Sequence, residues 1–278
     1  MNNIALGQYY PAKSVMHRLD PRIKVIGAIA YIVAAFLCRN VTAFAFLLLS
    51  CFVLILISRI PLRIVLKSVR ALVFIMLFTA VLNVFWVTDA TVEPLFAWRF
   101  IRIYERGIYQ AVFILVRIVA MVIGTSLFLT YTTSPIALTD AIERLLKPLA
   151  KFHVPIHTFA MMLTIALRFI PTIVEETDKI MAAQKARGAD FTTGSLTKRA
   201  KALIPVIVPL FASAFRRADE LATAMECRCY HGGEGRTKLR VLRLGGRDVV
   251  ALLLMGFFIA AIVLLNVFGS RYAWLFTM

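Results

Sequence analysis

Residues 41–57 read VTAFAFLLLSCFVLILI and include no charged side chain. An uninterrupted apolar run of this length is close to what an α-helix needs to cross about 30 Å of hydrocarbon. The rest of the chain has the same character, because 60% of its 278 residues are hydrophobic and its mean hydropathy is +0.81. Soluble domains usually contain about 45–50% apolar residues. The excess predicts an integral membrane protein.

Four further apolar runs flank this stretch. Residues 25–38 precede it and are separated from it only by Arg39 and Asn40, so we expect the two runs to form a tight helical hairpin. The other runs are residues 71–87, 108–131 and 249–268. Arg117 is the only charge within the five runs; it could pair with a carbonyl or an acid, reach the membrane surface, or contact a partner. The sequence predicts an all-α membrane protein with about five transmembrane helices.

The distribution of charge predicts the orientation. Residues 13–24 and 58–70 each contain four Lys or Arg, and the only acid among them is Asp20, whereas the 88–107 loop is balanced. The positive-inside rule then places the N-terminus and the 58–70 loop in the cytoplasm of a bacterium and, with five spans, the C-terminus outside the plasma membrane. The net charge of +17 is explained by this topology without nucleic acid as a partner.

Residues 132–248 differ from the apolar runs. They mix 18 Lys and Arg with 11 acids and retain helical apolar periodicity. We interpret them as amphipathic coupling helices at the cytoplasmic face of the membrane. A spanning or re-entrant hairpin that includes residues 156–173 is the alternative. The expected domains are therefore a four-helix membrane domain at 1–131, a coupling region at 132–248 and a C-terminal transmembrane helix at 249–278.

Two similar segments, 41 residues apart, end predicted helices within this region. The first ends in Lys185-Ala186-Arg187-Gly188, and the second in Glu226-Cys227-Arg228-Cys229. We expect Pro171 and Pro209 to lie in the first turns of these helices, and Gly188 to stop the first in a left-handed conformation. An arginine at a slim helix tip can offer its five donors to a groove on a partner. The same pattern also fits an ordinary helix cap, and the residues alone favour neither reading.

Three separated motifs resemble those of one family, the transmembrane T component of energy-coupling factor transporters (the EcfT family). The segment around Arg187 is similar to the family's first signature, and the segment from Met225 to Tyr230 is similar to its second. The N-terminal residues, from Gly7 through the sequence 17–24, resemble its opening signature, and 167–171 also fits. The signature residues carried over are His17, Arg18, Asp20, Pro21, Arg22, Arg168 and Pro171.

The resemblance implies a non-catalytic coupling subunit of an ABC importer for vitamins or other micronutrients. In that family two arginine-ended helices insert into grooves of two similar cytoplasmic ATPases, expected here as a heterodimer, and a membrane S subunit binds the substrate. The implied docking residues are Ala186, Arg187, Gly188, Glu226, Cys227, Arg228, Cys229 and Tyr230. No cofactor or metal is expected on this chain, because ATP and Mg²⁺ belong to the partner ATPases. The motifs resemble the shared, group II branch; a component dedicated to cobalt, nickel or biotin is the alternative.

One departure concerns the second motif. The family's usual Ala-Arg-Gly is replaced by Cys227-Arg228-Cys229. Because cysteine lacks the conformational freedom of glycine, we expect the second helix to end differently and to unwind only at Gly232-Gly233.

Other functional classes find less support in the sequence. Cys227, Cys229 and His231 could supply three metal ligands, but no second ligand cluster completes a site, so we interpret the cysteines as free thiols. Residues 232–237 are glycine-rich but lack the lysine and preceding strand of a nucleotide-binding loop. A membrane-embedded enzyme would need converging ionisable groups at membrane depth, which the sequence does not show. A structural membrane scaffold without transport is a third hypothesis.

Overall fold

The computed structural model describes residues 9–86, 96–98, 101–152, 155–191, 193–232 and 244–271. Gly7, from the opening signature, lies outside them. The chain divides into two compact units. One comprises residues 7–141 and 242–278, and we call it the bundle; the other comprises residues 1–6 and 142–241, and we call it the helix pair after its two long helices.

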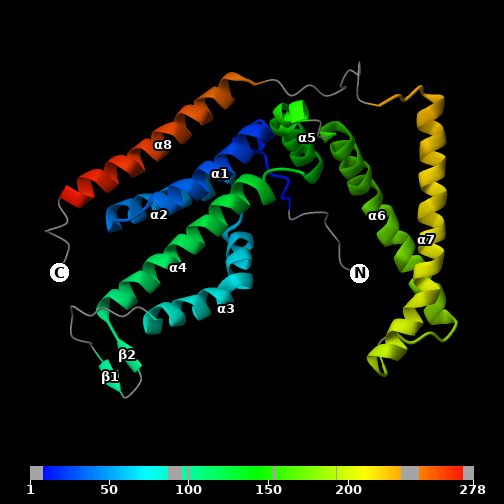
Figure 1. Cartoon of the computed structure of the whole chain (residues 1–278), viewed down its shortest axis with the longest axis horizontal. Coiled ribbons are helices and arrows are strands. Elements are labelled where there is room, and N and C mark those ends of the chain that lie inside the picture. Colours follow the sequence, from blue (N-terminus) through cyan, green and yellow to red (C-terminus); the bar gives the residue numbers. More distant parts are fainter. Residues whose placement is uncertain are drawn as a thin grey trace. The chain divides into compact units, whose positions relative to one another are not determined.

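The bundle is built from five long helices (Figure 1). They are α1 (Pro21–Leu37), α2 (Val41–Ser58), α3 (Leu62–Trp86), α4 (Glu105–Thr125) and α8 (Gly246–Arg271). A π-helical turn, η2 (Ser126–Thr130), continues α4, and a short 3₁₀ turn, η1 (Met16–Arg18), precedes α1. Each helix contains most of one predicted apolar run, and α1 extends beyond its run to include Arg22 and Lys24. α3 begins nine residues before its run, so the loop expected at 58–70 is reduced to residues 59–61.

A short antiparallel hairpin lies between α3 and α4. Its strands are β1 (Phe96–Trp98) and β2 (Ile101–Ile103), with Ala97 opposite Arg102. The sequence predicts only a loop with balanced charge at 88–107, without strands. The hairpin leaves the architecture of the bundle helical.

Small side chains let the bundle helices approach closely. Ala34 and Ala35 of α1 and Ala120 of α4 are fully buried in one core, together with Leu47 of α2 and Ile262 of α8. At Gly124 a Cβ atom would lie 2.3 Å from the Tyr31 ring, so only glycine lets α4 pass α1 at this point.

Arg117 pairs with a backbone carbonyl. Its Nη2 donates to the Cys38 carbonyl oxygen at 2.9 Å, and its guanidinium lies 5.3 Å from the centre of the Phe44 ring. Asn266 of α8 serves the same α1–α2 turn, since its Nδ2 donates to the Leu37 carbonyl oxygen and its Oδ1 accepts from the Arg39 N–H. These side chains satisfy turn groups that lipid could not.

The opposite end of the bundle, where α1 and α8 begin and α2 ends, carries many bases. We call it the basic end, defined by the Lys and Arg residues that the structure places there: Lys13, Arg18, Arg22, Lys24, Arg59, Arg63 and Arg247. Lys24 is buried, and its Nζ donates to the Thr132 carbonyl oxygen at 2.7 Å. This bond ties the start of α1 to the segment that follows η2.

Five helices of the described chain are long and apolar enough to cross a membrane. They are α2, α3, α4 continued through η2, α8 and α6 (Ile156–Ala186). The number agrees with the expectation, but α6 takes the place expected for α1. α1, with 17 residues or about 25 Å, is one residue shorter than α2, whereas α6 has 31 residues. The prediction that α6 lies on the membrane's inner face stays a prediction.

The helix pair consists of α6 and α7 (Leu196–Cys227), and α5 (Pro135–Leu146) with the 3₁₀ segment η3 (Lys147–Phe152) leads into it. The expectation that Pro171 and Pro209 begin their helices is wrong, because both lie inside continuous helices, as does Pro205. A proline removes one backbone hydrogen bond and can kink a helix, but here the apolar residues before each proline continue the helix. The segment 203–215, which contains Pro205 and Pro209, is helical throughout.

Candidate functional site: two arginine-ended helix tips

The first tip is a complete left-handed helix cap. Gly188 has φ +85°, its N–H donates to the Lys185 carbonyl oxygen at 3.0 Å, and the Ala189 N–H donates to the Gln184 carbonyl oxygen at 3.0 Å. These two bonds form the Schellman motif, which satisfies carbonyls that a helix end leaves open. The predicted stop at Gly188 is confirmed, and it fixes Arg187 as the last residue before the chain turns away.

The second tip has the same cap without a glycine. Cys229 has φ +56°, its N–H donates to the Glu226 carbonyl oxygen at 2.8 Å, and the Tyr230 N–H donates to the Met225 carbonyl oxygen at 3.1 Å. The expectation that this helix unwinds only at Gly232 is wrong. The two hydrogen bonds, and that of the His231 ring to the Cys229 carbonyl oxygen at 2.8 Å, hold the cysteine in a conformation that costs about 1–2 kcal/mol.

The two caps are therefore equivalent at an offset of 41 residues. Both arginine side chains are exposed, and among the described residues neither has a hydrogen bond or an ion pair. The flanking Ala186 and Cys227 are exposed as well. Each tip thus presents a guanidinium with five unused donors on a narrow helix end, which suits a carboxylate- or carbonyl-lined groove.

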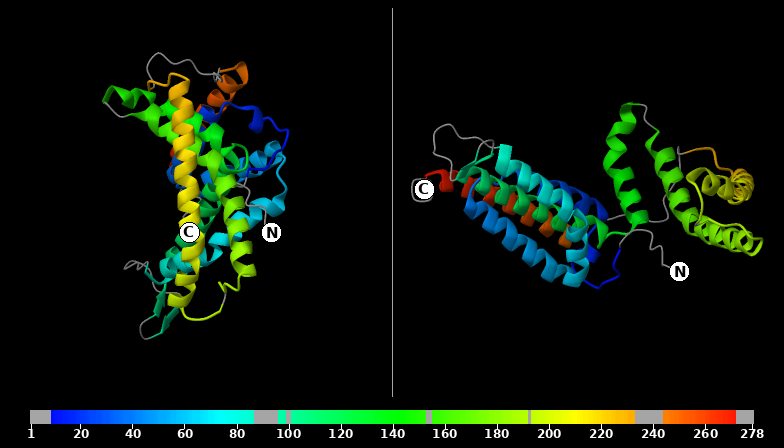
Figure 2. Two further views of the ribbon diagram at one scale, coloured as in Figure 1. Left: turned by 90° about the vertical axis from the view of Figure 1, so that its right-hand side faces the viewer. Right: turned by 90° about the horizontal axis from the view of Figure 1, so that it is seen from below.

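The same offset relates the residues that join α6 to α7. Arg217 Nη2 donates to Glu176 Oε2 at 2.7 Å, and each of these residues lies 11 positions before the arginine of its own tip. With a rise of 1.5 Å per residue, each tip is about 16 Å from this ion pair. Figures 1 and 2 show α6 and α7 crossing, with the end of α6 and the end of α7 at opposite ends of the pair. The crossing thus places two similar tips far apart.

The opening signature lies in the bundle and forms a hydrogen-bonded turn. His17 Nε2 is 2.9 Å from the Tyr10 carbonyl oxygen, and His17 Nδ1 is 2.7 Å from Ser14 Oγ. Since a carbonyl oxygen only accepts, Nε2 carries the proton and Nδ1 accepts from the serine hydroxyl. The ring is thereby fixed at both nitrogens, while Arg18 beside it is exposed.

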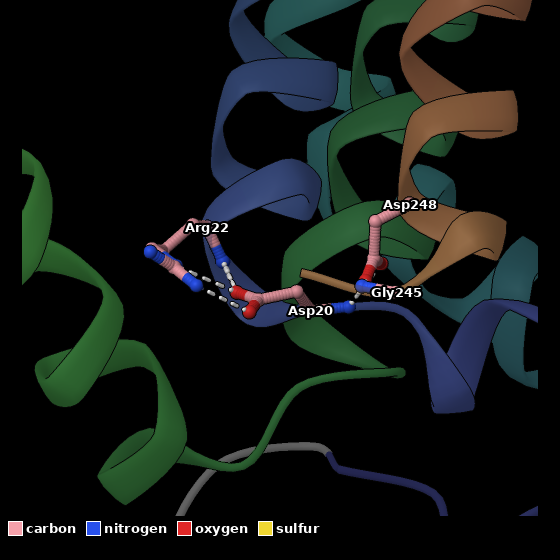
Figure 3. Close-up of polar contacts among 4 residues, drawn as sticks. All are labelled: Asp20, Arg22, Gly245 and Asp248. Carbon is pink, nitrogen blue, oxygen red and sulfur yellow. Dashed lines mark hydrogen bonds and ion pairs between the residues drawn. The ribbon is translucent and has the colours of Figure 1, made fainter. Parts of the chain in front are cut away.

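Asp20, Pro21 and Arg22 form the start of α1. The Asp20 carboxylate accepts from the Arg22 N–H at 2.9 Å and pairs with the Arg22 guanidinium at 2.9 Å, while Pro21 occupies the first helical position. The two signature residues Asp20 and Arg22 are thus partners in one ion pair. In Figure 3 the backbone of Asp20 also approaches Asp248, whose Oδ1 accepts the Asp20 N–H at 2.8 Å.

Asp248 links the starts of α1 and α8, a contact that the sequence analysis did not predict. Its Oδ2 accepts the Gly245 N–H at 2.8 Å, so one buried carboxylate caps α8 and holds the start of α1. The position of an acid three residues after Gly245 is a capping signal, but nothing in the sequence points across 228 residues to Asp20.

The remaining signature residues lie on α6. Arg168 and Pro171 are exposed, and in the described chain they are not joined to the residues of either tip. The described His, Cys, Asp and Glu residues form no group of three that could hold a metal ion. The tips and the signature turn belong to different compact units, so the structure groups the predicted residues into separate sites.

Comparison with known proteins identifies the kind of protein. Residues 12–239 match the family model CbiQ, described as cobalt transport protein. A protein of Clostridium kluyveri is 50% identical over 251 residues, which cover 90% of this chain and 92% of the relative. One of Thermosediminibacter oceani is 46% identical over 99% of this chain and 100% of its own length, and one of Bacillus subtilis is 46% identical over 89% and 92%. All three are named energy-coupling factor transporter transmembrane protein EcfT.

Proposed function

Because this chain belongs to the CbiQ/EcfT family and is a transmembrane component of an energy-coupling factor transporter, we propose that it couples ATP-driven movement to substrate uptake. Two cytoplasmic ABC-type ATPases bind the tips at Arg187 and Arg228, and a separate membrane S subunit carries the substrate. This chain performs no chemistry, and ATP and Mg²⁺ are bound by the partner ATPases.

The observation that carries the proposal is the equivalence of the two caps. A left-handed cap alone is common at helix ends. These two ends also share, at one fixed offset, an exposed arginine side chain without a partner among the described residues. A duplicated tip suits a duplicated partner, as a pair of related ATPases provides. Truncation of a buried arginine anchor at an interface costs roughly 2–4 kcal/mol, so loss of the arginine at either tip should weaken the complex.

The differences between the tips favour two non-identical ATPases. The first tip has Lys185 where the second has Glu226, and Gly188 where the second has Cys229. A single groove could not complement both a lysine and a glutamate equally well. We therefore propose a heterodimer whose two grooves share an arginine site and differ beside it.

The crossing of α6 and α7 supplies the mechanical link. When ATP brings the two ATPases together, each tip moves with its groove. The Glu176–Arg217 ion pair joins α6 to α7 about 16 Å along each helix from its tip. Contacts that differ between the open and closed ATPase pair give ATP leverage on the membrane part. Exposed apolar side chains on α6 and α7, such as Phe159, Phe211 and Phe215, offer a surface for the S subunit or lipid.

The orientation and the substrate class belong to the same proposal. We place the protein in the bacterial plasma membrane with the basic end of the bundle and the N-terminus in the cytoplasm and the C-terminus outside. The substrates are vitamins or other micronutrients that a shared, group II module delivers through several S subunits. A T component dedicated to cobalt, nickel or biotin is the alternative, and the description of the matching family model as a cobalt transport protein keeps it open.

The test removes both arginines. The variant Arg187→Ala/Arg228→Ala is expressed with the two ATPases and an S subunit, and co-purification and uptake are measured. We expect the ATPases to be lost from the purified complex and uptake to fall to background. Arg216→Ala, which removes an exposed arginine from the side of α7, is the matched control and should behave as wild type. Wild-type uptake by the double variant would refute the proposed role.

A further inference from the structure

The bundle contains a large apolar groove that the proposed coupling role does not use. Its volume is about 840 Å³, and it opens on the surface of the bundle between η1, α1, α2 and α8. Its lining includes Tyr31, Phe128, Met255 and Phe258, and almost all of it is apolar. The volume falls within the range of about 300–1,000 Å³ that is typical of sites for small molecules.

The groove has the depth of one membrane leaflet. On α1 it extends from Leu19, just before the helix, to Tyr31, and on α8 it extends from Gly246 to Phe258. Each interval is 12 residues, or about 18 Å along a helix, close to half of a hydrocarbon core of about 30 Å. A ligand in the groove would therefore enter at the basic end and stop near mid-membrane.

The polar atoms inside the groove are already satisfied. The Tyr31 hydroxyl lies 2.8 Å from Cys51 Sγ and 3.3 Å from Ser50 Oγ, and the Ser50 hydroxyl donates to the Leu47 carbonyl oxygen at 2.6 Å. In the part of the chain that the structure describes, the buried side-chain atoms without a partner belong to Arg117 and His157, which do not line the groove. The interior of the groove therefore suits an apolar ligand.

The entrance is positively charged. Arg247 lines the groove at the basic end and is exposed, and within the described ranges it has no ion-pair partner. Among the described residues no ion pair joins it to the adjacent Asp248, whose carboxylate oxygens accept the backbone N–H groups of Asp20 and Gly245. An arginine at the depth of the lipid headgroups favours a phosphate.

The floor of the groove is narrow. At Gly27 a Cβ atom would lie 2.3 Å from Met255 Cε and 3.1 Å from the Phe128 ring, so side chains of α8 and η2 fill the space beside α1 there. A helix of a partner, about 10 Å wide with its side chains, does not suit such a floor as well as a thin flexible chain does.

We propose that this groove binds one acyl chain of an anionic phospholipid, with the lipid phosphate on Arg247. The bound lipid fills the space between α1, α2 and α8 and so forms part of the bundle. This inference depends on the bundle lying in a membrane and is independent of the docking role of the tips.

The test is native mass spectrometry of the full transporter complex, purified in detergent and titrated with palmitoyl-oleoyl phosphatidylglycerol or palmitoyl-oleoyl phosphatidylcholine. The wild type should retain one phosphatidylglycerol and prefer it to phosphatidylcholine. Arg247→Gln should weaken phosphatidylglycerol binding about five-fold and abolish the preference, since one basic residue near the membrane surface has about that effect. Arg63→Gln, at an exposed base outside the groove, is the control and should retain both.

A second pair of variants tests the groove itself. Ala251 lines the groove, whereas Ala260 is exposed on the same helix and does not. Ala251→Phe should abolish retention of either lipid, and Ala260→Phe should leave it unchanged. Retention of phosphatidylglycerol by Ala251→Phe at the wild-type level would overturn the proposal, as would equal losses in Arg247→Gln and Arg63→Gln. Lipid bound to the isolated chain but absent from the assembled complex would show that a partner fills the groove, and would also overturn it.

Discussion

The bundle and the helix pair are both made of long helices with apolar stretches, yet they differ widely in the fraction of their residues that is buried. The 17 residues of α1 alone contribute seven buried residues. The 63 residues of α6 and α7 contribute three among those that the structure describes, namely Ile156, Ala160 and Val206. The bundle is therefore held by its own packing and by buried polar contacts. In the described part of the helix pair, one ion pair joins α6 to α7, and few side chains are buried.

This contrast suits the proposed division of labour. A membrane anchor must keep one structure while the transporter works, and close packing provides that rigidity. An element that follows the ATPases must change its contacts, and elements with few buried contacts open at low cost. Changes in the bundle should therefore lower stability, and changes in the helix pair should mainly lower coupling.

The largest effect on stability is expected at Asp248. Asp248→Ala removes the acceptor of two backbone N–H groups, those of Asp20 and Gly245, at a cost of about 2–4 kcal/mol. The apparent melting temperature of the purified protein should fall by about 5–10 °C. Asp219→Ala, at an exposed acid of α7, should not change it. Equal melting temperatures of Asp248→Ala and wild type would show that Asp248 does not stabilise the bundle.

An intermediate effect is expected at the tips, where the two substitutions should act in opposite directions. Gly188→Ala places a Cβ on a residue with φ +85° and Cys229→Gly removes one from a residue with φ +56°, each worth about 1 kcal/mol. Nothing lies within 4 Å of a Cβ at Gly188, so the effect there is one of backbone strain without a clash.

The two substitutions should change the affinity for the ATPases in opposite directions. Gly188→Ala should weaken binding about five-fold and Cys229→Gly should strengthen it by a similar factor, measured by titration of the purified subunits, because each tip must hold its cap in order to dock. Weaker binding by Cys229→Gly would show that the thiol itself contacts the partner and that strain does not limit docking.

The smallest effect on stability is expected at the crossing of α6 and α7. The Glu176–Arg217 pair is partly exposed, so Glu176→Gln should cost no more than about 1 kcal/mol and leave the melting temperature within about 2–4 °C of wild type. Glu175→Gln, at the neighbouring exposed acid, is the control. If Glu176→Gln destabilised the protein as much as Asp248→Ala, the contrast between the two units would be wrong.

Much of the bundle could be predicted from the sequence. Each apolar run lies in a helix, and residues 41–57 have nearly the bounds of α2, because lipid and a helical core both demand continuous apolar residues. The start of α3 was missed by nine residues, because its first turns contain Arg63, Lys67 and Arg70. The contacts between runs could not be predicted in this way. Asp248 and Asn266 reach residues more than 220 positions away, and sequence periodicity carries no signal for such pairs.

The positions of the two tips were predicted correctly, but the start of the first helix and the cap of the second were not. Arg187 and Arg228 end their helices as expected, since a repeated motif marks a repeated structure. Pro171 was misread as a helix start because proline favours the first turn, although a long helix can retain one in its interior. Cys229 was expected to prevent the left-handed cap, but two cap hydrogen bonds outweigh the preference of a single residue.

The most direct test of the coupling role is to ask what each tip touches. A photo-crosslinking amino acid is placed at Ala186 and, separately, at Cys227 in the assembled transporter, whose two ATPases carry different tags. Position 186 should crosslink to one ATPase and position 227 to the other, while Lys179, exposed on the same helix as Ala186 and about 12 Å from the first tip, should give no adduct. Absence of ATPase adducts from both tips, with adducts at Lys179 or on the S subunit instead, would contradict the account.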